Sequence, residues 1–119
     1  MSNRYYDELA SYDREGFLVI VDKTYEDTNP RDSFDWSEEE LDQLINDINN
    51  GKYDWFMLRV RVLLDGHELG RSYLGGCLYE DPMEVLTDGT AEDFIEEALI
   101  EARGEVRRLK ERLNALAVE

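Results

Sequence analysis

The segment from Tyr53 to Leu64 restricts the fold more than any other part of the chain, because its apolar side chains recur at every second position. One side carries Phe56, Leu58, Val60, Val62 and Leu64, and the other carries Trp55, Met57, Arg59 and Arg61. A period of two is typical of a β-strand with one buried face. Asp65-Gly66 follows at once and favours a type I′ turn, so residues 67–73 are expected to return as the second strand of an antiparallel hairpin.

Another strand is predicted over residues 17–21, a run of apolar side chains rich in β-branched residues. Residues 1–15, which precede it, are expected to form a flexible or packed arm, with a helical turn over residues 5–12 as the alternative. Residues 24–35 are predicted to form a loop, because an Asn-Pro pair interrupts them.

A helix is predicted to begin at Ser37, because Ser37 and Glu40 match the pattern of a capping box. Trp36 and Leu41 stand at the positions of a hydrophobic staple around the same helix start. Gly51 is expected to end the helix in the left-handed conformation. The apolar face of this helix consists of Leu41, Leu44, Ile45 and Ile48.

A longer helix is predicted over residues 91–117, capped by Thr90 with Asp93, after a single helical turn that begins at Asp81-Pro82. Its apolar positions recur in steps of four and three residues: Ile95, Leu99, Ala102, Val106, Leu109, Leu113 and Leu116. At 1.5 Å per residue this helix would extend about 40 Å, which is longer than a three-stranded sheet is wide. Two interpretations of this stripe stay open. Either the whole stripe packs on the sheet, or residues 103–119 project beyond it. A projecting end would favour a homodimer through Val106, Leu109, Leu113 and Leu116.

Together these elements predict a single α+β domain over residues 1–119, with the order β-α-β-β-α. Its sheet is expected to contain three antiparallel strands, with the helices on one face and a long helix at the C-terminal end. The expected core takes the apolar face of each element: Leu18, Ile20, Leu41, Leu44, Ile48, Phe56, Leu58, Val60, Val62, Ile95, Leu99 and Ala102.

The chain is strongly acidic, with 29 Asp and Glu against 13 Lys and Arg and a formal net charge of −16. Self-repulsion of this size opposes compaction, so the charge points to solubility or to a cationic partner. Direct binding of nucleic acid is not expected, because phosphate contacts require Lys and Arg. Hydrophobic residues still make up 42% of the chain, which is enough for a folded core. The single Cys77 and the lack of a long apolar run favour the cytoplasm, with no membrane contact.

The acidic residues fall in two blocks, since residues 7–54 hold 15 acids and 4 bases while residues 80–102 hold 9 acids and no base. Carboxylates one helical turn apart lie about 6 Å apart, a spacing comparable with that of phosphates along a nucleic-acid strand. The rows of acids on two helices therefore predict a surface that imitates the phosphates of nucleic acid. The alternative is an acidic face that is merely solvated. The residues expected to bind a basic protein are Glu38, Glu39, Asp42, Asp47, Glu80, Asp81, Glu84, Glu92, Glu96, Glu97 and Glu101, with short-range contacts from Tyr25, Trp36 and Tyr79.

No catalytic, phosphate-binding or zinc-binding motif occurs in the chain, so no cofactor and no metal is expected. His67 is the only histidine, and Cys77 could approach it across the hairpin as a nucleophile and base. A small hydrolase built on this pair is one alternative, although no third group that would orient the two is recognisable. We expect a protein without catalytic activity.

Three segments carry a resemblance to known proteins: Asp54-Trp55-Phe56 through Arg59-Val60-Arg61, residues 65–70 and residues 74–79. They are similar to small proteins of unassigned role carried by phages and other mobile elements. In size and acidity the chain also resembles the DNA-mimic anti-restriction and anti-CRISPR proteins of such elements. These resemblances imply an inhibitor that covers the nucleic-acid-binding groove of a restriction or CRISPR complex in the bacterial host cytoplasm. An acidic dimeric adaptor of a phage or mobile element is the alternative.

Overall fold

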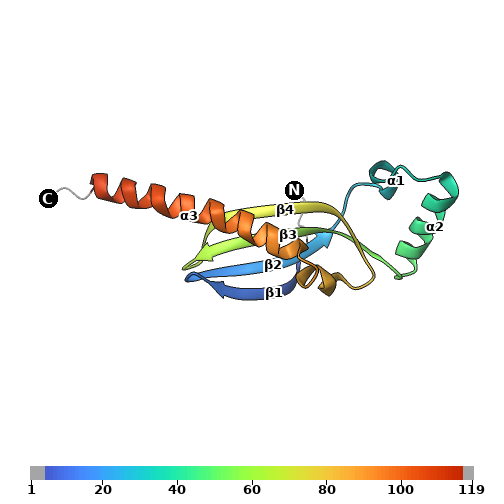
Figure 1. The fold of residues 1–119 in the computed structure, drawn as a ribbon, viewed down its shortest axis with the longest axis horizontal. Helices are drawn as coiled ribbons and strands as arrows, with labels where there is room; N and C mark the ends of the chain where they lie inside the picture. Colours follow the sequence, from blue (N-terminus) through green and yellow to red (C-terminus); the bar gives the residue numbers. More distant parts are fainter. Residues whose placement is uncertain (1–4, 117–119) are drawn as a thin grey trace.

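Four strands and one long helix form the body of the molecule (Figure 1). The computed structural model describes residues 5–116. All four strands pair antiparallel in one sheet with the order β1-β2-β3-β4. Residues 1–4 of the expected arm and residues 117–119 of the expected projection lie outside the described residues. In chain order the elements are β1 (Asp7–Arg14), β2 (Phe17–Tyr25), α1 (Pro30–Ser33), α2 (Glu38–Asn49), β3 (Asp54–Leu64), β4 (His67–Tyr79), the 3₁₀ turn η1 (Pro82–Leu86) and α3 (Thr90–Leu116).

The expectation of a three-stranded sheet is wrong, because residues 7–14 form strand β1 and pair with β2. The two strands are joined by Glu15-Gly16, whose φ angles of 57° and 87° are those of a type I′ turn. The predicted Asp65-Gly66 turn between β3 and β4 has the same form, with φ angles of 49° and 83°. The sequence pattern misses β1 because four of its eight residues are charged and none is β-branched. Its strand conformation comes from pairing with β2.

The core lies between the sheet and α3, and it takes the opposite face of β2 from the one expected. Val19 and Val21 are fully buried, whereas Leu18 is 47% exposed and Ile20 is only half-buried. A continuous apolar run has no alternation that would choose a face, so the position of α3 decides it. The predictions for β3 and α3 are confirmed, since both contribute the expected residues to this core: Phe56, Leu58, Val60, Val62, Ile95, Leu99 and Ala102.

Helix α3 runs across β4, β3 and β2, and its backbone passes close to Gly70 of β4. A Cβ atom at position 70 would lie 2.1 Å from the carbonyl oxygen of Ala98. Nearby, the Ser72 hydroxyl donates a hydrogen bond of 2.7 Å to the carbonyl oxygen of Phe94. The absence of a side chain at Gly70 therefore permits direct contact between helix and strand.

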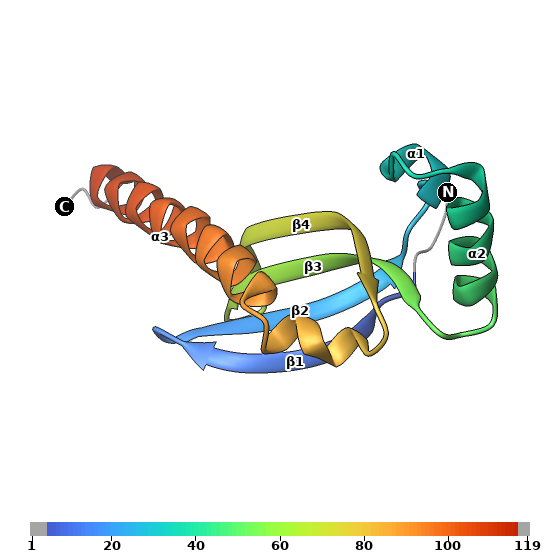
Figure 2. The same ribbon diagram turned by 45° about the vertical axis from the view of Figure 1, so that its right-hand side comes forward.

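Helix α2 does not share the face that α3 covers, which corrects the expectation of all helices on one face. It lies beyond the end of the strands, together with α1 (Figures 1 and 2). The capping box is confirmed, because Ser37 Oγ accepts from the Glu40 backbone and the Glu40 carboxylate accepts from the Ser37 backbone. Trp55 Nε1 donates to the carbonyl oxygen of Thr28 at 2.9 Å and so ties the preceding loop to β3. Leu41 and Leu44 are buried outside the main core, and Ile48 is only half-buried.

The molecule is elongated, with principal extents of 70 × 27 × 26 Å. Helix α3 contributes to this length, because its second half continues past the sheet (Figure 1). None of the helices described over residues 5–116 combines the length and the hydropathy that a membrane span requires.

Leucine truncations on the two faces of the sheet test this assignment. Leu58→Ala is expected to lower the free energy of unfolding by about 2–5 kcal/mol, because Leu58 is fully buried and its truncation leaves a cavity. The same truncation at Leu18, on the exposed face, is expected to cost less than about 1 kcal/mol. Urea unfolding followed by circular dichroism measures both. Equal losses for the two variants would contradict the burial of a single face.

Candidate protein-binding surface

The acids on the outer side of α2 are held by one arginine of α1. Arg31 Nη1 donates to Glu38 at 3.0 Å, and Arg31 Nη2 donates to Asp42. The bond to Asp42 raises the pKa of the Arg31 guanidinium above its ordinary value. Glu39, on the same helix, is exposed and has no ion-pair partner among residues 5–116. The row of acids expected on α2 is therefore partly neutralised within the chain.

Arginines likewise bind part of the acidic row on α3. Arg14 of β1 makes a bidentate pair with Glu92, with distances of 2.8 and 3.0 Å, and this bond holds the pKa of Glu92 below its ordinary value. Arg103 reaches Glu96 at 3.2 Å. Glu101 accepts a hydrogen bond of 2.8 Å from the backbone nitrogen of Arg71. These acids keep exposed oxygens, but part of their charge is compensated.

Several predicted binding residues keep an uncompensated charge. Asp81 accepts from the backbone nitrogen of Met83 at 3.0 Å and so caps η1. Asp47 accepts from the side chain of Gln43 at 2.9 Å. The exposed carboxylates without an ion-pair partner in the described part of the chain include Glu39, Glu80, Glu84 and Glu97. These residues come from α2, the segment around η1, and α3, so negative charge remains along much of the molecule.

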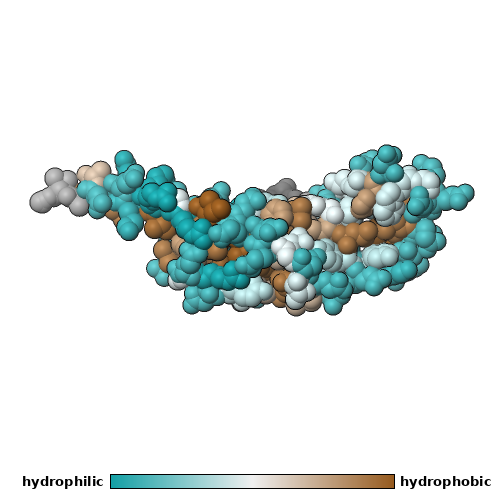
Figure 3. All heavy atoms as spheres, viewed as in Figure 1, coloured by the Kyte–Doolittle hydropathy of each residue, from teal (hydrophilic) through white to brown (hydrophobic). Residues whose placement is uncertain are grey.

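A hollow of about 310 Å³ lies between α2 and the end of the sheet, and we call it the α2 pocket. Figure 3 shows apolar atoms exposed in this region of the molecule. The pocket is lined by Trp36, Glu40, Gln43, Leu44, Asp47, Tyr53 and Leu78.

The two carboxylates of the α2 pocket accept hydrogen bonds from neutral groups. Glu40 Oε1 accepts from the backbone nitrogen and the hydroxyl of Ser37, at 3.2 and 2.9 Å, while Asp47 accepts from Gln43. No Lys, Arg or His side chain within residues 5–116 lies at ion-pair distance from either of them. Apolar walls combined with uncompensated carboxylates suit the long stem and cationic head of Lys or Arg.

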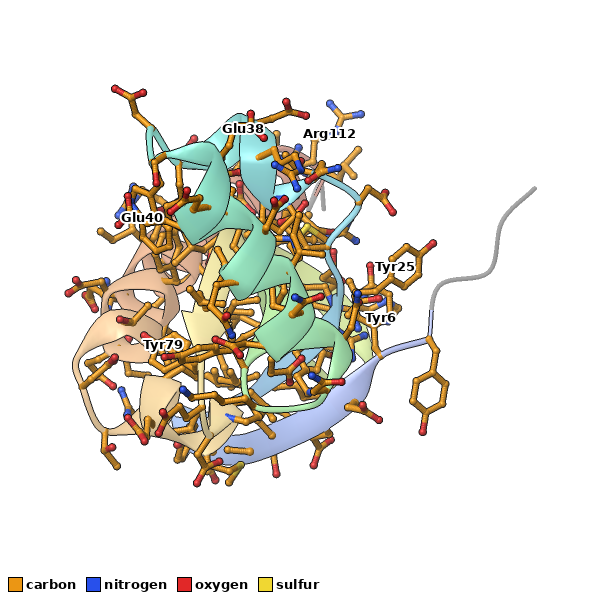
Figure 4. The ribbon with its side chains drawn as sticks, turned by 90° about the vertical axis from the view of Figure 1, so that its right-hand side faces the viewer. Tyr6, Tyr25, Glu38, Glu40, Tyr79 and Arg112 are labelled. Carbon is orange, nitrogen blue, oxygen red and sulfur yellow. The ribbon has the colours of Figure 1, made fainter. Side chains whose placement is uncertain are left out.

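The aromatic side chains expected to contact a partner lie on two sides of the molecule. Figure 4 shows Tyr79 on one side of α2 and Tyr25, with Tyr6, on the other. Trp36 and Tyr25 are 44% and 53% exposed. Tyr79 is half-buried, and its hydroxyl donates to Asp88 at 2.5 Å and lies 3.1 Å from the Thr90 hydroxyl. Trp36 is therefore available beside the α2 pocket, whereas Tyr79 is engaged within the chain.

The sequence does not predict the α2 pocket, although its spacing places the lining residues of α2 on one face of that helix. Glu40, Gln43, Leu44 and Asp47 follow the spacing of one helical face. Tyr53 and Leu78 come from the far end of the loop after α2 and from β4, and no sequence pattern relates them to α2. The residues expected at a dimer contact lie elsewhere, on the second half of α3, where Val106 and Leu109 are half-buried while Leu113 and Leu116 are exposed.

The described residues do not bring the candidate catalytic pair together. His67 and Cys77 stand near opposite ends of β4, about 30 Å apart at the rise of a strand. Cys77 is buried in the core, and this burial raises the pKa of its thiol to about 11. Within residues 5–116, no group of three or more His, Cys, Asp or Glu side chains is arranged to hold a metal ion.

Comparisons with known proteins do not assign this chain to a family. No protein-family model, curated protein or solved structure matches it.

The environment of Cys77 predicts low reactivity in the native state. With a pKa of about 11, the buried thiol holds very little thiolate at pH 8. The native protein is expected to react with an aromatic disulfide reagent roughly 100-fold more slowly than the urea-unfolded chain. His67→Ala should leave the native rate unchanged, because His67 lies far from the thiol. A fast native reaction that His67→Ala abolishes would contradict their separation.

Proposed function

We propose that this protein is a nonenzymatic acidic inhibitor that occupies a basic, nucleic-acid-binding surface of another protein in the bacterial cytoplasm. The observation that carries this proposal is the α2 pocket, where two uncompensated carboxylates border an apolar hollow on a chain with a net charge of −16. The α2 pocket takes one Arg or Lys side chain of the partner. The exposed acids around it supply complementary charge.

The lining of the α2 pocket supports a cationic side chain as its occupant. The aliphatic stem would pack against Trp36, Leu44 and Leu78, and the cationic head would reach Glu40 and Asp47. Trp36 also offers a ring face, which attracts a guanidinium or ammonium group. Arg and Lys are the residues with which proteins contact phosphates, so a nucleic-acid-binding surface presents them in number.

The shape and charge of the whole molecule support competition with nucleic acid. A net charge of −16 along a molecule 70 Å long averages one negative charge for each 4.4 Å or so of length, and the charge is denser outside residues 103–116, which hold five bases and two acids. One strand of a DNA duplex carries a charge about every 3.4 Å. Long-range attraction of this kind accelerates encounter with a basic partner and weakens as salt screens it.

The resemblance to phage-encoded inhibitors makes restriction and CRISPR complexes the first targets to assay. The alternative function is an acidic dimeric adaptor, which the projecting end of α3 favours. The two functions differ in one measurable property. An inhibitor of the proposed kind excludes the target's nucleic acid, whereas an adaptor binds a target that keeps it.

The test begins with a salt-dependent target, captured from host lysate on immobilised wild-type protein at low salt and released at high salt. Each captured DNA- or RNA-binding protein is purified, and its binding to its own labelled nucleic acid is measured by fluorescence anisotropy. Wild-type protein is expected to displace the nucleic acid competitively. Formation of a ternary complex would contradict the inhibitor proposal and support the adaptor.

The double variant Glu40→Gln/Asp47→Asn tests the α2 pocket within that assay. Gln at position 40 can still complete the capping box, so the charge is removed while the helix start is preserved. The affinity for the target is expected to fall about tenfold or more, since charge-assisted hydrogen bonds contribute about 1.5–3 kcal/mol each. Glu8→Gln/Asp13→Asn removes the same charge from exposed positions of β1 and serves as the matched control. Equal affinities for the two double variants would show that total charge, and not the α2 pocket, determines binding.

A further inference from the structure

The second half of α3 has little support from its own chain. We call residues 103–116 the α3 tail. Ala102 is the last buried residue of α3, and Val106 packs only at the edge of the core. Farther along, Leu113 and Leu116 are each 62% exposed. Figure 1 shows the α3 tail extending past the end of the sheet.

The exposed apolar side chains of the α3 tail continue the stripe that packs on the sheet. They recur at helical spacing, so they share one side of the helix. An unsupported helix of this length is marginally stable in water, because most helical stability in proteins comes from packing an apolar face. The α3 tail therefore has the properties of a helix whose apolar face packs against a partner. Its apolar positions are Val106, Leu109, Leu113 and Leu116.

We propose that the partner is a second copy of this chain and that the two α3 tails pack antiparallel. The apolar positions are separated by three, four and three residues, a spacing that reads the same in both directions. An antiparallel pair therefore sets Val106 against Leu116 of the second copy, and Leu109 against Leu113 of the second copy. Such a contact is isologous, and two-fold contacts of this kind are the commonest among soluble oligomers.

Charge selects the antiparallel arrangement over the parallel one. The chain before residue 103 holds 26 acids and 8 bases, whereas the α3 tail holds 5 bases and 2 acids. Parallel tails would place two acidic bodies side by side. Antiparallel tails hold these bodies at opposite ends, and each basic tail points toward the acidic sheet tip of the other copy. That tip carries Asp13, Glu15 and Asp65 at the two hairpin turns.

A contact within the chain shows that the tip and the tail attract each other. Arg103, the first residue of the α3 tail, pairs with Glu15 through two hydrogen bonds of 2.9 and 2.6 Å. Arg103 lowers the pKa of Glu15 below its ordinary value through these bonds. Among the bases beyond Arg103, Arg108 pairs with Glu105 of the same tail. In the antiparallel pair, the acidic tip of the second copy comes near the other bases.

Sedimentation equilibrium and light scattering across a micromolar concentration series test the dimer. The wild-type mass is expected to approach twice the 14.0 kDa of one chain. Association through the apolar stripe should persist at high salt, because salt screens both the repulsion between two chains of net charge −16 and the attraction between tail and tip, while apolar burial does not depend on charge. Partner binding under the proposed function weakens with salt, so failure of one proposal is distinguishable from failure of the other. A wild-type mass that stays at one chain throughout the series would overturn the dimer.

Two variants of exposed side chains separate the stripe from the rest of α3. Leu113→Glu places a charge in the proposed contact and is expected to give a folded monomer, since Leu113 touches little of its own chain. Ile100→Glu introduces the same charge at a residue that is 60% exposed on another side of the helix, and it should leave the dimer intact. Circular dichroism verifies that both variants fold. A dimer that survives Leu113→Glu, or one that only Ile100→Glu disrupts, would refute the contact.

Disulfide formation between introduced cysteines determines the orientation, in a Cys77→Ser background. In the antiparallel pair, position 106 faces position 116 of the other copy, while each lies about 15 Å along the axis from its own counterpart. A disulfide needs Cβ atoms about 4 Å apart. Mixed Val106→Cys and Leu116→Cys proteins are therefore expected to crosslink under copper-catalysed air oxidation, and neither variant alone should do so. Self-crosslinking of both variants would show a parallel dimer and overturn the orientation.

Discussion

The packing of α3 against one face of the sheet is the interaction on which the rest of the structure depends. Its inner side contributes the buried residues Ala91, Ile95, Ala98, Leu99 and Ala102. The small residues Ala98 and Ala102 and the absence of a side chain at Gly70 on β4 let the helix lie directly on the strands. Because a single long helix covers the sheet, Val19 and Val21 of β2 and the alternate apolar side chains of β3 are buried beneath it, whereas Leu18 lies on the other face. The packing of α3 covers neither the other face of the sheet nor the second half of α3 itself.

A cluster of charged side chains lies on the other face of the sheet. Asp22 is 3% exposed, and its carboxylate accepts from Arg59 Nε at 2.8 Å and Arg59 Nη2 at 2.6 Å. Arg61 lies 3.5 Å from the same carboxylate, and Arg59 stacks on the Tyr6 ring at 3.5 Å from its centroid. A buried carboxylate is tolerated only with partners of this kind. The positive charges of β3 are therefore used within the fold, which leaves the outer surface acidic.

Arginines outside β3 determine which acids of that surface are paired within the chain and which can bind a partner. Arg14, Arg31 and Arg103 each pair with an acid from another part of the fold, although exposed ion pairs of this type contribute little to stability. They compensate the outer side of α2 and part of α3. Over residues 5–116 the carboxylates at the α2 pocket have no such neighbour, and apolar walls adjoin them. Uncompensated charge beside apolar surface separates this site from the acids of α2 and α3 that pair with arginine.

The sequence by itself determined the local elements, because their signals act over a few residues. The Asp65-Gly66 turn, the Ser37 capping box and the stripe of α3 depend on backbone conformation and hydrogen bonds between near neighbours. The tertiary structure decided β1, whose strand conformation comes from the edge of β2, and the burial of Val19 in place of Leu18, which depends on where α3 lies. It also decided the α2 pocket, because the side chains of α2 meet Tyr53 and Leu78 only after the loop carries α2 past the end of the sheet. Contacts between distant segments leave no periodic signal in a single sequence. For that reason the sequence predicts acidic helices but not the α2 pocket in which two of their carboxylates lie.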